Sequence, residues 1–152
     1  MDKKVIVSVK GNQNQGDEQS DGVELITYGS YSKKGNEYTL TYHETEITGM
    51  QGTVTTLKVV GDRVILMRFG SNNSQMVFEK GHKHTGYYET PYGSFTISTL
   101  SNQMQIDLGD KGGEIKVGYT LQIDNELAGE NDFHLQIKEA KKAHDKLGSR
   151  NN

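Results

Sequence analysis

Two charged residues lie where the sequence is otherwise apolar, and they are the first candidates for chemistry. Glu44 follows Tyr42 at a spacing of two, so in an extended segment both side chains share one face. Arg68 is the single charge in Val64–Gly70, the densest apolar run of the chain. If both charges point inward, they can form a buried ion pair, or Arg68 can bind a carboxylate or phosphate on a ligand. The alternative is a salt bridge at the rim of the fold, and the alternation leaves the direction of Arg68 open.

Tyrosine is the most abundant aromatic residue, with eight copies in the chain. A phenol ring gives a binding cavity an apolar wall and a polar group at its edge. Ordinary strand propensity and core packing explain any single tyrosine equally well. The candidate ligand-binding residues are the two charges and three of the tyrosines: Tyr42, Glu44, Arg68, Tyr88 and Tyr119.

The histidines and the remaining motifs give no further site. His82 and His84 would lie on one side of an extended segment, but zinc sites need three or four ligands. His43 and His134 fall on the polar faces of other segments. The chain has no phosphate-binding glycine loop and no Gly-x-Ser-x-Gly nucleophile motif, and the sequence places no carboxylate pair in one cleft. We therefore expect no metal, no cofactor and no enzymatic activity.

Composition limits the class of protein. A chain of 152 residues forms one domain with a real core, and 18 glycines with one proline favour strands and tight turns. The absence of cysteine excludes a disulfide framework and a thiolate metal site. A net charge of −3 argues against nucleic acid as the main partner. No apolar stretch is long enough for a membrane span or a signal peptide, so we expect a cytoplasmic protein that does not bind membranes.

Alternating apolar residues and turn signals predict a series of short strands. The expected strands lie at residues 5–9, 23–33, 37–47, 53–60, 64–70, 76–81, 87–90, 93–100, 103–108, 114–124 and 133–137. The pair at 93–108 can also be one long strand that bends near Ser101-Asn102. Gly11–Gly22 has no apolar residue and is expected to be a mobile loop or a connection at a barrel mouth, and His82–Gly86 a polar connection. The domain is expected to cover residues 1–140, with 141–152 as a charged tail.

About eight to ten strands joined by hairpin-length turns indicate an all-β, antiparallel domain. We expect a closed up-and-down β-barrel rather than a two-sheet sandwich, because closure removes unpaired sheet edges. A barrel of this size either fills with side chains or holds one small ligand.

Several short motifs add a family resemblance to this prediction. In chain order they are Tyr42-x-Glu44, Lys58-Val59, Met67-Arg68-x-Gly70, Phe78-x-x-Gly81, Tyr88 followed by Gly93, and Gly113-x-Ile115 followed by Tyr119. With these motifs the chain, from Val5 to about Ala140, resembles the YwiB-like proteins, a family of small uncharacterised bacterial proteins. The resemblance implies a β-barrel of calycin-like, lipocalin-type fold, and it implies no reaction.

Three hypotheses about function follow from these patterns. The first is a non-enzymatic barrel that binds one small molecule, anionic or amphipathic, in its interior. An interior cavity below about 300 Å³ would exclude it. The second is an interaction or structural module with a side-chain-filled barrel, which meets a protein partner or a second copy of itself. The third is an unrecognised enzyme, which would need two of Glu44, Arg68 and the histidines within about 4 Å of one point in a cleft.

Overall fold

The computed structural model describes residues 2–15, 18–19 and 23–140, and most of these residues are in strands. The elements in chain order are β1 (Lys3–Gln15), β2 (Glu18–Gln19), β3 (Val23–Lys34), β4 (Glu37–His43), the short 3₁₀ helix η1 (Glu46–Thr48), β5 (Thr53–Val60), β6 (Arg63–Gly70), β7 (Asn73–Glu79), β8 (Lys83–Thr90), β9 (Gly93–Gly109), β10 (Gly112–Ile123) and β11 (Glu126–Glu139).

The strands close into a barrel. From β3 to β11 each strand pairs antiparallel with the next, β1 pairs with β3, and β11 pairs back with β1. The closing ladder runs from Val5 opposite Glu139 to Asn14 opposite Glu130. Within the described residues, ten strands form the barrel and the two-residue β2 extends the sheet beside β1. The prediction of a closed, antiparallel, up-and-down barrel is confirmed.

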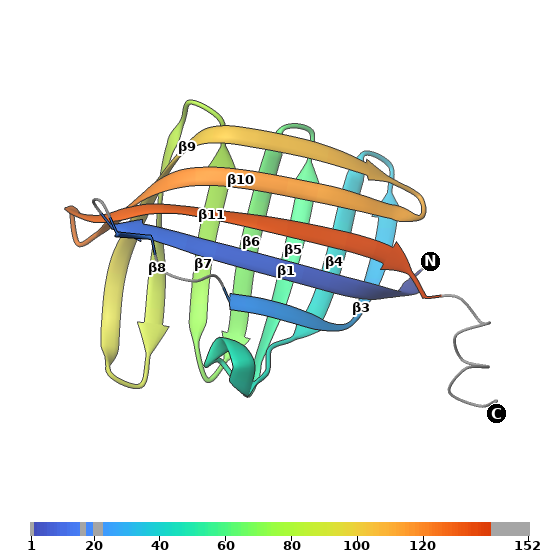
Figure 1. Cartoon of the computed structure of the whole chain (residues 1–152), viewed down its shortest axis with the longest axis horizontal. Coiled ribbons are helices and arrows are strands. Elements are labelled where there is room, and N and C mark those ends of the chain that lie inside the picture. Colours follow the sequence, from blue (N-terminus) through green and yellow to red (C-terminus); the bar gives the residue numbers. More distant parts are fainter. Residues whose placement is uncertain (1, 16–17, 20–22, 141–152) are drawn as a thin grey trace.

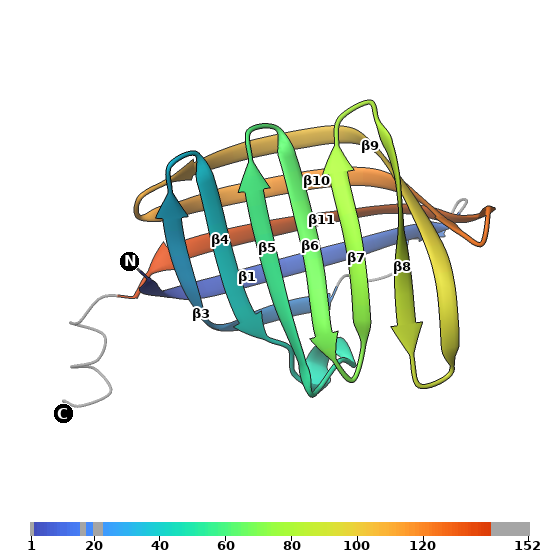
Figure 2. The same cartoon turned by 180° about the vertical axis from the view of Figure 1, so that it is seen from behind.

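The barrel wall consists of two groups of strands that cross at a steep angle (Figures 1 and 2). Strands β4–β8 run side by side, and β1, β10, β11 and most of β9 run across them. The long strand β9 joins the two groups by bending. Its pairing with β10 skips Asn102, because Gly118 faces Gln103 while Tyr119 faces Ser101. Such a bulge bends a strand without ending it. Residues 93–108 therefore belong to one long, bent strand, which is the second of the two arrangements expected from the sequence.

Three predicted local structures are wrong at their boundaries. Residues 11–15 continue β1 instead of starting a loop, because the backbone of 11–14 pairs with β11 and that of Gln15 with β2. This pairing needs no apolar side chain. The rest of the expected loop up to Gly22 lies mostly outside the described residues, apart from β2. The expected connection at His82–Gly86 belongs largely to β8, which pairs with β9 from Lys83 onward.

The strand expected at residues 37–47 ends at His43, and η1 follows it. Thr45 has an extended backbone and its hydroxyl accepts a hydrogen bond from the Ile47 amide, which caps η1. Gly49 ends η1 in the left-handed region at φ 75°. This turn of helix holds Thr48 beside Glu44, which becomes important for the site.

Side chains fill one half of the barrel interior. The buried residues of this packed half are Val5, Val7, Tyr31, Leu40, Val59, Val64, Phe78, Ile115, Val117 and Ile137. Each apolar side chain removed from water contributes roughly 1.5–3 kcal/mol. Among the described residues, no helix is long and apolar enough to cross a lipid bilayer. The expected charged tail, 141–152, lies outside the described residues.

Candidate functional site

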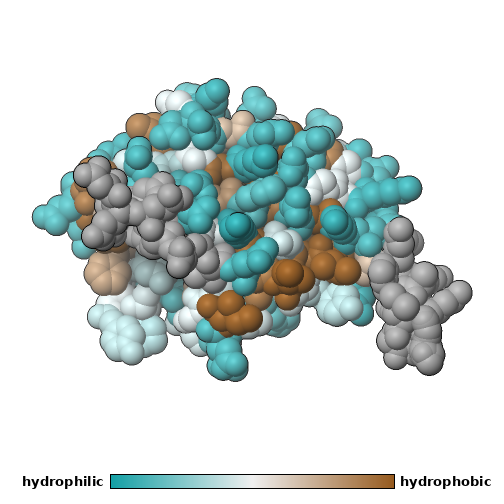
Figure 3. All heavy atoms as spheres, in the orientation of Figure 1, coloured by the Kyte–Doolittle hydropathy of each residue, from teal (hydrophilic) through white to brown (hydrophobic). Residues whose placement is uncertain are grey.

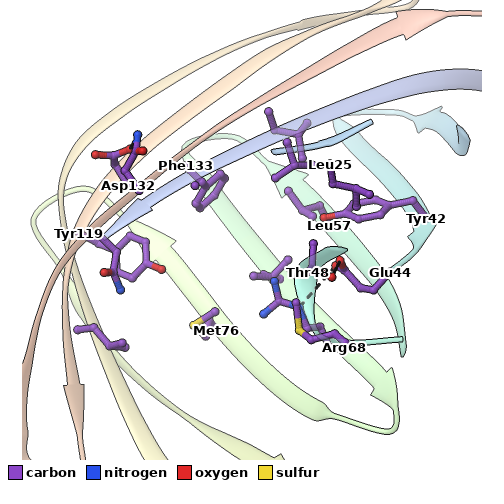
Figure 4. Close-up of a pocket in the computed structure, with 18 residues that line it drawn as sticks. Leu25, Tyr42, Glu44, Thr48, Leu57, Arg68, Met76, Tyr119, Asp132 and Phe133 are labelled. Atoms are coloured by element: carbon purple, nitrogen blue, oxygen red, sulfur yellow. Dashed lines mark hydrogen bonds and ion pairs between the residues drawn. The ribbon is translucent and has the colours of Figure 1, made fainter. Parts of the chain in front are cut away.

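The other half of the interior is hollow, and it contains a cavity of about 430 Å³ (Figure 4). This volume exceeds the roughly 300 Å³ at the low end of known ligand pockets. The lining residues are Val9, Gly11, Asn12, Leu25, Tyr42, Glu44, Thr48, Met50, Leu57, Leu66, Arg68, Met76, Tyr119, Leu121, Asn131, Asp132, Phe133 and Leu135. Four of the five predicted site residues are among them: Tyr42, Glu44, Arg68 and Tyr119.

Strand register determines which way these side chains point. Tyr42 on β4 pairs with Thr55 on β5, and Thr55 pairs with Arg68 on β6. Residues directly opposite each other in antiparallel strands share a face of the sheet. Tyr42 and Thr55 are buried, at 3% and 0% exposure, so Arg68 points inward with them. The direction of Arg68, which alternation left open, is thereby settled.

Glu44 is held by three hydrogen bonds. Its backbone amide donates to the Thr53 carbonyl at 2.8 Å, so the hydrogen bonding between β4 and β5 continues for one residue beyond the end of β4. The Thr48 hydroxyl donates to one carboxylate oxygen at 2.9 Å, and the Thr55 hydroxyl donates to the other at 2.5 Å. The carboxylate side chain is only 2% exposed, and both of its oxygens are hydrogen-bonded.

Arg68 lies next to this carboxylate but is not hydrogen-bonded to it. Its Nε lies 3.8 Å from Glu44 Oε2, which makes an ion pair, and its side chain is 18% exposed. The Nε atom is buried and has no hydrogen-bond partner in the described part of the chain. Figure 4 shows the guanidinium among the cavity-lining side chains, with the ion pair drawn as a dashed line. Glu44 and Arg68 therefore form an ion pair with no net charge, and the guanidinium N–H donors of Arg68 are not used in hydrogen bonds to Glu44.

Two tyrosine hydroxyls stay protonated beside this pair. Burial and then the negative charge of Glu44 raise the pKa of Tyr42, while Arg68 opposes the shift. Burial also raises the pKa of Tyr119, against the opposing effects of Asn131 and Arg68. Since both shifts favour the neutral phenol, each hydroxyl is a hydrogen-bond donor at ordinary pH.

Tyr88, the fifth predicted site residue, does not line the cavity. It shares the inward face through its pairing with Ser74 and Phe95, but it lies half-buried near the β8–β9 hairpin. Its hydroxyl accepts a hydrogen bond from Asn72 Nδ2 at 3.1 Å, and its ring lies 6.5 Å from that of Phe95. Tyr88 therefore supports the barrel wall next to the site.

Several residues of the site, in the cavity lining or in contact with it, were not predicted. The alternation of β5 puts Thr55 on the buried face with Leu57, so periodicity alone would have found this partner of Glu44. Thr48 gave no signal, because η1 interrupts the strand pattern. Asp132 accepts a hydrogen bond from Asn12 Nδ2 at 3.1 Å, and this pair depends on the closing contact between β1 and β11.

The histidines of the described ranges do not line the cavity. His84 contacts Glu79 at 3.0 Å and His134 contacts Glu114 at 2.7 Å, and a hydrogen bond from the histidine lowers the pKa of each carboxyl. In the described residues, no three or more His, Cys, Asp or Glu side chains lie together as metal ligands.

Comparisons with known proteins agree with this architecture. The model of a family described as a domain of unknown function (DUF1934) matches residues 7–135. An "uncharacterized beta-barrel protein YwiB" from Bacillus subtilis is 27% identical over 123 residues, which are 81% of this chain and 80% of that protein. The crystal structure of the ywiB protein from Bacillus subtilis superposes with a TM-score of 0.80 at 22% identity, covering 92% of this chain and 94% of that one. The predicted YwiB-like resemblance is confirmed, and the chain belongs to the DUF1934 family of β-barrel proteins of unknown function.

Proposed function

We propose that this protein binds one small molecule in the hollow half of its barrel and catalyses no reaction. The observation that carries this proposal is the cavity of about 430 Å³ that inward-facing side chains of the barrel line with mainly apolar surface. Its volume is that of a pocket for a small organic molecule.

The cavity lining also supports an organic ligand. Most of the wall is apolar, with Leu57, Leu66 and Met76 on neighbouring strands, and the polar groups gather around Glu44 and Arg68. Ligand pockets commonly combine apolar walls with a few convergent polar groups. A ligand with an apolar body and at least one polar group matches this lining.

The geometry favours binding over catalysis. Glu44 and Arg68 do lie within 4 Å of each other in a cavity, which is the minimum that the enzyme hypothesis requires. A general base, however, needs a free lone pair directed at the substrate. The Glu44 carboxylate accepts both threonine hydroxyls, is ion-paired with Arg68 and is only 2% exposed, which favours a role in positioning Arg68.

A second candidate function is protein interaction, and one surface feature favours it. On one face of the barrel, Ile26 of β3 is 65% exposed and Ile47 of η1 is 61% exposed. Figure 3 shows hydrophobic side chains gathered over β1, β3 and η1 on this face. Exposed apolar clusters often mark contact surfaces. A protein partner or a second copy of the chain could use this one without involving the cavity.

Native mass spectrometry of protein purified without denaturation tests the leading proposal. We expect a noncovalent adduct at one molecule per chain. Leu66→Phe places a larger side chain in the cavity and should weaken the adduct. Ile65→Phe, one position away on the opposite face of β6, is the matched control and should retain it. A bare chain mass that stays bare with every apolar probe would refute binding.

A further inference from the structure

Two polar groups of the site are buried without a hydrogen-bond partner in the described ranges, the Arg68 Nε and the Asn131 side-chain oxygen, and Arg68 is the charged one. A guanidinium carries five N–H donors. No hydrogen bond joins these donors to another residue in the described ranges, and Nε is fully shielded from solvent. Donors that are buried without acceptors cost free energy, so such a group in a native protein calls for an explanation. Nε itself has no exposed surface, so a ligand in the cavity would meet the guanidinium through the exposed part of the side chain.

Glu44 does not meet this need. Its oxygens are occupied by Thr48 and Thr55, and the 3.8 Å to Arg68 Nε is beyond hydrogen-bond range. The negative charge of the carboxylate offsets the free-energy cost of burying the Arg68 cation, while the N–H donors of the guanidinium remain available. This is the arrangement expected of a preorganised anion receptor.

The groups around Arg68 are also mainly donors. The charge of Arg68 opposes the rise in the pKa of both Tyr42 and Tyr119, and all three side chains line the same cavity. Both phenols remain protonated because burial raises their pKa more strongly. The Tyr42 hydroxyl already interacts with Glu44 and Thr55, and the Tyr119 hydroxyl with Asn131, so the guanidinium is the main donor that this end of the cavity offers to an acceptor-rich group.

Away from Arg68, the polar lining of the cavity includes Asn131 and Asp132, of which only Asp132 is charged. Asp132 is already paired with Asn12. Leu25, Leu66 and Phe133 line the intervening wall. A ligand bound here has one polar head and an apolar body.

We infer that the ligand is an amphipathic monocarboxylate whose head is bound by Arg68 and whose body lies along the apolar wall. This inference rests on the proposed binding function and specifies its ligand class. A planar carboxylate matches the planar guanidinium in a bidentate geometry. Glu44 disfavours a phosphate dianion, because two negative charges would then lie close to an existing carboxylate. A neutral head would satisfy fewer donors.

Isothermal titration calorimetry with decanoate, decan-1-ol and decyl phosphate tests this inference, with octanoate and dodecanoate to adjust for length. We expect decanoate to bind wild-type protein about tenfold more tightly than decan-1-ol, which is about 1.4 kcal/mol. Decyl phosphate should bind more weakly than decanoate. Arg68→Met should reduce the affinity for decanoate to that for decan-1-ol. The control Arg63→Met removes an exposed arginine from the same strand and should change neither affinity.

Glu44→Gln gives the sharpest outcome, because a merely structural Glu44 would not produce it. Removing the competing negative charge should tighten decanoate binding and leave decan-1-ol binding unchanged. If Arg68→Met unfolds because Glu44 is left uncompensated, the double variant Glu44→Gln/Arg68→Met keeps the site neutral and serves in its place. Equal binding of decanoate and decan-1-ol by wild-type protein would overturn the carboxylate inference and leave small-molecule binding intact. Failure of every probe to bind would overturn both.

Discussion

The two halves of one barrel interior are built from the same strands, yet one half is packed and the other is hollow. On β4, Leu40 belongs to the packed half and Tyr42 to the cavity wall. On β6, Val64 and Arg68 divide in the same way. Strand alternation determines which side chains point into the barrel. It does not determine whether inward side chains from opposite walls contact each other. What separates the halves is the polar chemistry carried at the hollow end.

Tyrosines show this difference most directly. In the packed half, Tyr31 donates a hydrogen bond to the Gly109 carbonyl at 2.7 Å, and Tyr38 donates to the Leu108 carbonyl at 3.4 Å. These phenols tie β3 and β4 to the opposite wall and are satisfied by the protein itself. In the hollow half, Arg68 has no hydrogen-bond acceptor among the described residues. The packed half contributes to stability, because its tyrosine hydroxyls are hydrogen-bonded within the protein. The hollow half leaves polar groups without partners, and these are available to a ligand.

Truncation at the boundary between the halves should have the largest effect. Phe78 is fully buried and its ring contacts those of Tyr119 and Phe133, at centroid distances of 4.8 and 5.4 Å. We expect Phe78→Ala to lower the free energy of unfolding by about 3–5 kcal/mol. Met76→Ala, two residues earlier on β7, should cost less because Met76 already borders a void. Urea denaturation of both variants measures the difference, and equal costs would mean that the halves are packed alike.

Enlarging an inward-pointing side chain should destabilise the protein more in the packed half than in the hollow half. Val64→Phe overpacks the packed half and should cost about 1–3 kcal/mol of folding free energy. Leu66→Phe places the same ring in the cavity and should cost markedly less, while blocking the site. Thermal denaturation and probe binding are to be measured on both. A Leu66→Phe variant as unstable as Val64→Phe would show that the cavity is not open to a side chain.

Alkaline pH should weaken the packed half through Tyr31. Burial, helped by Tyr38 and Asp110, raises the pKa of Tyr31 from its ordinary 10 to about 12. The folded state therefore holds this proton more tightly than the unfolded state does. The resulting stabilisation is complete below pH 10 and is lost as the pH rises from 10 through 12. Denaturation across this range should show a steeper loss for wild-type protein than for Tyr31→Phe, and parallel curves would contradict the assignment.

The smallest effect is expected outside the barrel. Arg63 forms an exposed ion pair with Glu79 at 3.4 Å, and solvent screens it. Arg63→Met should change the free energy of unfolding by less than about 1 kcal/mol. Arg68→Met, in contrast, removes an arginine whose side chain is 18% exposed and leaves the buried Glu44 unpaired. Comparable denaturation midpoints for the two variants would remove the distinction between the surface pair and the interior pair.

Much of the fold could be predicted from the sequence, because hairpin barrels depend on local signals. Alternation in β10 and turn signals such as Gly61-Asp62 predicted strands that the structure confirms. One of the errors occurred where pairing is long-range. The polar residues 11–15 look like a loop until β11, distant in sequence, pairs with them.

The site was predicted in part for the same reason. Glu44 and Arg68 were recognised as charges within apolar patterns, and register then brought Tyr42 and Arg68 to one face. The direction of Arg68 could not be predicted, because both faces of β6 carry apolar residues. Thr48 reaches Glu44 through η1, a local departure from the strand period that no periodicity argument predicts.

Methyl NMR during a titration with decanoate tests the central claim most directly, because methyl groups mark both halves of the interior. We expect shifts at Leu25, Leu66 and Leu121, which line the cavity, and little change at Val5 and Val64 in the packed half. Exposed Ile26 on the outer face of β3 should also stay unchanged. Shifts confined to the packed half or to the outer surface, or no shifts at saturating decanoate, would contradict the assignment of the hollow half as the binding site.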